Sequence, residues 1–226
     1  NNDLQIIETT LENLNTGFKN SSNEMFISFT NSLIKISDTV LESGIDDQLG
    51  QNPIDENGNL QPCIFNKLYA VNKMSDIAIV DPINFLIKSN ETCAVITNYF
   101  SLLAQKRQLD DELRLLACRN LDSVVKACAN SGFSYKNDDL NLLTESCVLN
   151  SLYDFITGIA NLPYSNELLV INCEVKMYLQ NLDSLKSIID KFGNLIKERW
   201  DVVTSMLNFP FIFITNYDQP ILNEST

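Results

Sequence analysis

The sequence predicts an all-α fold, a compact multi-helix bundle of about seven to nine helices with disulfide staples. Three observations lead to this prediction. Apolar residues recur three and four positions apart in most windows, glycine and proline are scarce at 7 and 6 residues, and these breakers cluster at boundaries rather than recurring at the short spacing typical of β-sandwiches. With 45% hydrophobic residues the chain can bury a substantial core. We expect residues 1–226 to form a single helical domain with a less regular C-terminal tail, about 209–226.

The first half of the chain alternates apolar stripes with capping signals. Gly44 ends the second predicted helix, and residues 44–62 form the longest loop. Asp55 to Asn59 lies in that loop, but its acidic and amide residues lack the spacing of a calcium loop, so it is read as a turn. Pro82 suits the first position of a helix that Asp81 caps. Helices are expected in this half over residues 4–14, 26–40, 63–74, 82–87 and 90–103.

In the second half of the chain the stripes of apolar residues are longer and predict longer helices. The Asn-Ser-Gly run at 130–132 ends one helix, and Pro163 breaks the next. Gly193 falls inside the last predicted helix and marks a bend there. The apolar run 209–214 must pack across the helices or meet a partner, and intramolecular packing is the better expectation. Helices are expected over residues 110–129, 138–160, 167–181 and 182–207.

Charge and composition exclude several functions. The net charge of −13 opposes binding to phosphate backbones and anionic lipids, so neither nucleic acid nor membrane is expected as a partner. Histidine is absent, which removes the commonest general base and the usual zinc ligand. We therefore predict a protein that is not an enzyme, with no catalytic residues, no metal and no cofactor. The acidic groups around 46–47, 110–112 and 138–139 are read as helix caps, Lys106–Arg107 as a solvated helix end, and Trp200 as a core anchor.

The even number of widely spread cysteines is typical of a secreted protein, and the start at Asn1 without Met fits removal of a signal peptide; buried free thiols in a cytosolic protein are the alternative. The sequons add little, because a chain so rich in Asn, Ser and Thr contains about three by chance. Cys118 and Cys128 lie on one predicted helix about 15 Å apart, too far to pair with each other. Sequence does not choose among the remaining pairings. The disulfide candidates are Cys63, Cys93, Cys118, Cys128, Cys147 and Cys173, and the glycosylation candidates are Asn20, Asn90 and Asn223.

One stretch resembles a known family. Cys147 precedes a Tyr-Asp-Phe triplet at 153–155, Cys173 is followed by Val175-Lys176 and Tyr178, and Cys93-Ala94 lies upstream. This pattern is similar to the insect silk fibroin light chain. The resemblance implies an intrachain Cys93–Cys147 bridge and Cys173 as the intermolecular thiol, whereas Cys63, Cys118 and Cys128 have no counterpart in the family.

Two functions follow as expectations. The first is a secreted, non-enzymatic structural or interaction subunit, disulfide-linked to a large extracellular partner such as a silk heavy chain. The alternative is a secreted helical carrier of an apolar small ligand, with every cysteine paired within the chain. The disulfide map separates them, because an unpaired Cys173 favours the first function and six internally paired cysteines favour the second.

Overall fold

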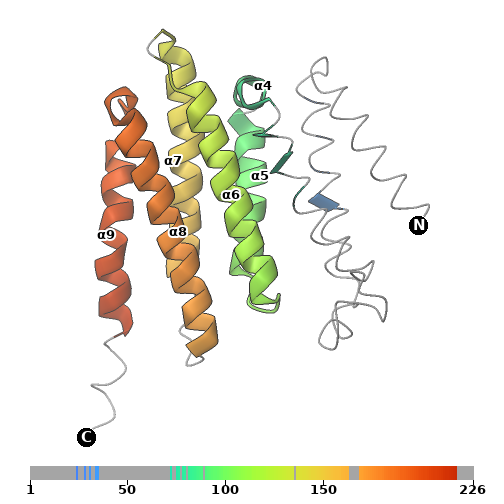
Figure 1. Cartoon of the computed structure of the whole chain (residues 1–226), viewed down its shortest axis with the longest axis vertical. Coiled ribbons are helices and arrows are strands. Elements are labelled where there is room, and N and C mark those ends of the chain that lie inside the picture. Colours follow the sequence, from blue (N-terminus) through green and yellow to red (C-terminus); the bar gives the residue numbers. More distant parts are fainter. Residues whose placement is uncertain are drawn as a thin grey trace, which may run out of the picture.

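The computed structural model describes residues 81–88, 90–134, 136–162 and 168–217, together with isolated helical positions between 24 and 35 and between 72 and 79. All the regular elements of this part are helices, so the all-α prediction is confirmed there (Figure 1). The predicted helices at 4–14 and 63–74, and the loop at 44–62, lie outside the described residues. The described helices are α4 (Pro82–Lys88), α5 (Asn90–Gln105), α6 (Asp111–Gly132), α7 (Asp138–Ala160), α8 (Leu168–Phe192) and α9 (Trp200–Tyr217), with a short 3₁₀ turn, η3, at Gly193–Leu195.

Capping side chains set the helix starts. Asp81 accepts a hydrogen bond from the Asn84 backbone N–H at 3.3 Å, and Pro82 occupies the first helical position as predicted. Asp110 caps α6 by accepting from the Leu113 backbone N–H at 2.8 Å. For α7 the cap is Asn137, and the two aspartates expected to cap it instead occupy its first turn, where they complement the helix dipole.

The helices form two layers, α5, α7 and α9 in one and α4, α6 and α8 in the other. Contacts between the layers join helices that are consecutive in the chain, from α4 to α8. Contacts within a layer join each helix to the next but one in the chain, from α4 to α9. Figure 1 shows α6 and α8 side by side, with α5 and α7 behind them. Helices α5 and α7 run parallel and in register, as do α6 and α8. Thr97 bonds Ser151, and one turn away Cys93 joins Cys147, both across 54 residues. This is the geometry of stacked helix pairs, in which each pair buries its apolar faces against its neighbours.

The core lies between the layers. Its largest fully buried apolar side chains come from four successive helices, and burying each contributes about 1.5–3 kcal/mol. Gly132 is required where α6 meets α4 and α7, because a Cβ there would lie 2.7 Å from Leu86 Cδ1 and would also overlap the Thr144 side chain. The large apolar side chains are Phe85, Leu86, Ile96, Phe100, Leu103, Leu121, Leu149, Leu152, Phe155 and Ile156.

The C-terminal third departs from the sequence prediction. The predicted boundary at 181–182 does not exist, because α8 continues through it to Phe192 without a breaker residue. The break falls instead at Gly193, where the 3₁₀ turn is followed by extended backbone at Ile196. The tail predicted to be less regular from 209 is helical in its backbone through Tyr217, since α9 continues past Pro210. Residues 218–226 lie outside the described part.

Candidate functional site

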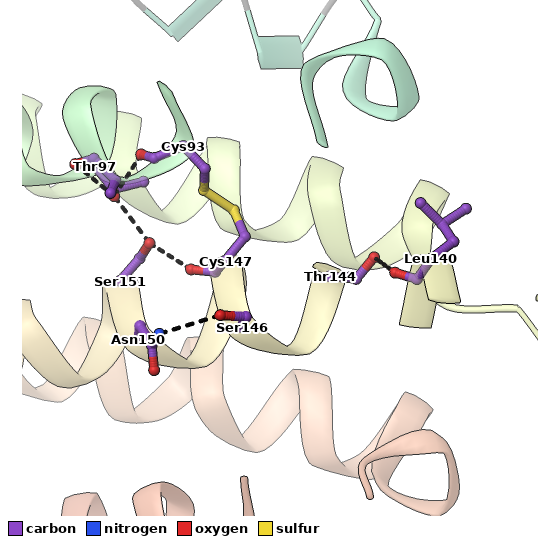
Figure 2. Close-up of a disulfide and its surroundings, with 9 residues drawn as sticks. Cys93, Thr97, Leu140, Thr144, Ser146, Cys147, Asn150 and Ser151 are labelled. Atoms are coloured by element: carbon purple, nitrogen blue, oxygen red, sulfur yellow. Dashed lines mark hydrogen bonds between the residues drawn. A yellow bond between two sulfur atoms is a disulfide. The ribbon is translucent and has the colours of Figure 1, made fainter. Parts of the chain in front are cut away.

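The contact between α5 and α7 contains a cysteine pair. Cys93 and Cys147 are joined in the structure with their Cα atoms 6.0 Å apart, which is within the range that a disulfide requires (Figure 2). One turn further along each helix, Ser151 Oγ donates to Thr97 Oγ1 at 2.9 Å. Both hydroxyls also bond the backbone carbonyl of the cysteine four residues before them. Neutral side chains therefore set the register of this interface.

The contact between α6 and α8 uses buried charges instead. Glu174, almost fully buried, accepts two hydrogen bonds from Arg107, at 2.7 and 2.9 Å, and one from Arg114 at 3.1 Å. Arg114 is 1% exposed and also donates to the Ala104 carbonyl at 2.9 Å. The prediction that Arg107 lies on a solvated helix end is wrong, because the turn before α6 directs its guanidinium onto α8. A bidentate arginine–carboxylate pair fixes both distance and orientation.

Two free thiols lie in this same interface. Cys118 is fully buried beside Met177 and Asn181, and burial raises its pKa to about 12. Cys173 is 3% exposed, and burial together with a hydrogen bond to Asp111 raises its pKa to about 11. Thiols of this kind are poor nucleophiles because their thiolate fraction is small at neutral pH. Cys173 therefore lacks the exposure that a bond to another chain needs.

A buried carboxylate also holds the start of α9. Glu145, on α7 and 1% exposed, accepts hydrogen bonds from the backbone N–H groups of Lys197 at 3.1 Å, Glu198 at 2.8 Å and Arg199. These three N–H groups lie in the segment immediately before α9, which begins at Trp200. By accepting them, Glu145 ties this segment, and with it the start of α9, to α7.

The side of α8 that faces away from α6 is exposed and carries two apolar residues among polar and charged ones. Val175 and Leu179 are 37% and 54% exposed, and each lies two residues from the fully buried Met177, which places them about 160° around the helix from it. On α9, Trp200 and Leu207 are 44% and 52% exposed. The prediction that Trp200 anchors the core is therefore wrong: its indole bonds the Ile196 carbonyl, and much of the ring remains accessible. We call these four residues, which lie on the last two described helices, the end face; Trp200 lies beside Gly193, beyond the last residue of α8, whereas Val175 and Leu179 lie nearer its start.

The other predicted sites are dispersed. Cys128 is a fully buried free thiol on α6, and burial raises its pKa to about 12. Asn90 is the first residue of α5. Cys63, Asn20 and Asn223 lie outside the described residues.

Sequence reasoning missed Glu174 and Glu145, although a signal for both was present. Each glutamate lies three residues before a fully buried apolar residue, on the apolar stripe of its own helix. A charged residue on such a stripe indicates a buried partner.

Within the described part of the chain, no group of three or more cysteine, aspartate or glutamate side chains could hold a metal ion. None of the described helices combines the length and the apolar character needed to cross a bilayer. Nothing in these helices therefore identifies a metal centre or a membrane span.

Comparison with known proteins gives one partial similarity. Over 177 residues, 74% of this chain, the sequence is 29% identical to Protein MON2 of Saccharomyces cerevisiae. The matched segment covers 11% of MON2, so the chain spans only a small part of that protein's length. No protein-family model matches the chain, and no solved structure matches it significantly.

This similarity corrects the functional reading. The resemblance to silk fibroin light chain is wrong, because the match that extends over most of the chain is to a yeast protein that is not a silk protein. The predictions of a secreted silk-like subunit, of an extracellular location and of a secreted glycoprotein are contradicted with it, since MON2 is intracellular. The short cysteine-centred motifs misled because they match so few positions.

Proposed function

We propose that this chain is a non-enzymatic helical scaffold that binds a partner protein through its end face. The observation that carries the proposal is the stacking of helices in two layers, with α5 parallel to α7 and α6 parallel to α8. In stacked-helix proteins each unit contacts only its neighbours, and the outer surfaces serve as extended binding platforms. The partial similarity to the much longer MON2 supports a role as one segment of an assembly rather than as a free catalyst.

The chemistry of the buried groups also favours a scaffold. Both deeply buried glutamates described above are saturated by internal donors, and the three free thiols are buried with raised pKa values. A catalytic acid or nucleophile needs access to substrate, which none of these groups has. The net charge of −13 favours a protein partner over nucleic acid.

The end face continues an interface that the fold already uses. α4, α6 and α8 stack in one layer, and α8 exposes Val175 and Leu179 on the side where another helix of that layer would lie. Terminal units of stacked-helix proteins normally have polar outer faces, because an apolar one favours association. We therefore expect the occupant to be an amphipathic helix of the partner protein, aligned with α8. A second copy of this acidic chain is disfavoured by charge repulsion.

A charge-matched pair of variants tests the proposal. Val175→Asp combined with Leu179→Asp puts two carboxylates on the end face, whereas Ser187→Asp combined with Ser205→Asp puts two on other exposed positions of α8 and α9. The full chain, expressed in cells, is cross-linked and its partners are identified by mass spectrometry. We expect specific partners of the wild-type chain to be retained by the serine variant and lost by the end-face variant.

Trp200 provides a second measurement with the partner so identified. It is the single tryptophan of the chain and is 44% exposed. Covering it should shift its fluorescence to shorter wavelength as partner is added. Equal partner recovery by both double variants, a partner that leaves Trp200 fluorescence unchanged, or a cross-linked product made only of two copies of this chain would each contradict the proposal.

A further inference from the structure

The cysteine pair between α5 and α7 differs from every other cysteine in the described part of the chain. Cys93 and Cys147 lie on adjacent parallel helices, at one level of the stack, with Cα atoms 6.0 Å apart. Cys118, Cys128 and Cys173 are free and buried. The fold therefore joins one pair of these five cysteines directly, with no rearrangement of the backbone.

The interface that holds the pair does not depend on the bond. The Ser151–Thr97 hydrogen bond sets the same register one turn away, and Ile96, Phe100 and Phe155 on the two helices are fully buried. Reduced cysteines would thus stay facing each other at nearly the same separation. A pair held ready in this way can close and reopen without unfolding the stack.

Whether such a bond is open or closed depends on the redox state of the compartment. Disulfides are rare in reducing intracellular compartments, where the exceptions are usually transient and redox-sensing. The intracellular location of MON2 places a related segment in such a compartment. We propose that Cys93 and Cys147 form a redox-responsive bond, open in a reducing compartment and closed on oxidation, that regulates how firmly α5 and α7 are held together. This inference goes beyond the scaffold function and does not require any particular partner.

The reaction is thiol–disulfide exchange with the glutathione couple. In closing, a cysteine thiolate attacks glutathione disulfide, forming a mixed disulfide and releasing one glutathione thiolate. The second cysteine, having lost its proton to water, attacks the mixed disulfide, forms the Cys93–Cys147 bond and releases the second glutathione. Opening is the reverse reaction, and Cys147, at 8% exposure against 2% for Cys93, is the less buried of the two residues that the incoming glutathione can attack.

The other thiols are protected from the same chemistry. Cys118 and Cys128 have no exposed surface, and burial raises the pKa of each to about 12. Cys173 is nearly as buried, and its hydrogen bond to Asp111 adds to the effect of burial on its pKa. Selectivity therefore comes from the fold, because Cys93 and Cys147 already face each other and Cys147, at 8% exposure, is the least buried of the five cysteines.

The consequence lies in the mechanics of the stack. The bond links two successive helices of one layer and closes a loop that contains all of α6. The α6–α8 contact in the other layer has no such covalent link and is made by non-covalent contacts, among them the pairing of Arg107 and Arg114 with Glu174 and the hydrogen bond from Ser184 to Asp122. Oxidation should therefore stiffen one side of the stack relative to the other, and raise the melting temperature by about 10 °C.

The experiment equilibrates the full chain in buffers with a graded ratio of reduced to oxidised glutathione, then quenches with acid and labels free thiols with a maleimide. Peptide mapping by mass spectrometry reports each cysteine separately. We expect Cys93 and Cys147 to gain and lose the label together, with a midpoint inside the series, while Cys118, Cys128 and Cys173 change little. Thermal unfolding of the two end states should show the shift of about 10 °C.

Variants distinguish the proposed bond from a general effect of oxidation. Cys147→Ser should abolish the difference in melting temperature between the oxidised and reduced states, whereas Cys128→Ala should retain it. A pair that stays labelled at every ratio, a bond that no ratio opens, or oxidation that joins a different pair would each overturn the inference. These readouts are independent of partner binding, so failure of the scaffold proposal would leave them unaffected.

Discussion

The α5–α7 and α6–α8 interfaces have the same geometry and opposite chemistry. In both, two parallel helices meet in register, across 54 residues in the first and about 60 in the second. The first interface is set by a cysteine pair and a neutral Ser–Thr hydrogen bond, whereas the second is set by buried arginines on a buried glutamate. The difference teaches that stacking needs only matched apolar faces, while the register can be set by any directional contact at one level. Charged contacts set it more strictly, because an error leaves a charge buried without a partner.

The largest expected effect tests the charged interface. Glu174→Gln leaves the guanidinium of Arg114 buried without its carboxylate, so the free energy of unfolding should fall by about 3–5 kcal/mol. Urea denaturation measures it. Asp190→Asn on the same helix removes an exposed ion pair with Lys186 and should change stability hardly at all. Similar losses from both substitutions would show that the buried cluster does not fix the α6–α8 register.

The next test concerns α9, which belongs to the layer of α5 and α7 but is held by a charge. Glu145→Gln removes the carboxylate that accepts three backbone N–H groups, and should cost about 2 kcal/mol. Hydrogen exchange should accelerate first at residues 197–203, before α7 is affected. Asp138→Asn, which breaks only the partly exposed contact with Lys197, serves as the control and should leave exchange in α9 unchanged.

A smaller effect is expected in the neutral interface. Ser151→Ala removes the hydroxyl that links Cys147 O and Thr97, and should cost about 1 kcal/mol, typical of one buried hydrogen bond. Ser123→Ala removes an exposed hydroxyl bond within α6 and is the matched control. If Ser151→Ala cost as much as Glu174→Gln, the contrast between the two interfaces would fail.

The smallest expected effect is a pH dependence of the free energy of unfolding that comes from the buried thiols. Burial raises the folded-state pKa of Cys128 from 9.0 to about 12. Its contribution to stability is therefore complete below pH 9 and is lost as the pH rises towards the folded value, because the unfolded chain releases this proton first. Between pH 8 and 9.5 the loss should be about 0.8 kcal/mol. Urea denaturation at these two pH values should show a shallower decline in Cys128→Ala, and an unchanged slope would contradict the prediction.

Much of the local structure could be predicted from particular residues. Asp81 with Pro82, and Asp110 before a charged first turn, set helix starts where the sequence indicated them. The boundary at 181–182 could not be found, because the change of apolar stripe there reflects a change of packing partner along one continuous helix. The side chains of the candidate sites were harder still: Arg107 and Trp200 were each assigned the opposite environment, since a residue's exposure depends on which helix lies across from it.

The sequence by itself determined that this protein is helical, acidic, free of histidine and rich enough in apolar residues to form a core. Periodicity, capping and composition depend on residues close together in the chain, so they can be recognised in the sequence without knowing the fold. Only the tertiary structure decided that the helices stack in two parallel layers, that Cys93 faces Cys147 while Cys173 is enclosed, and that Glu174 and Glu145 join helices. Those facts depend on contacts across more than fifty residues, which no local pattern encodes.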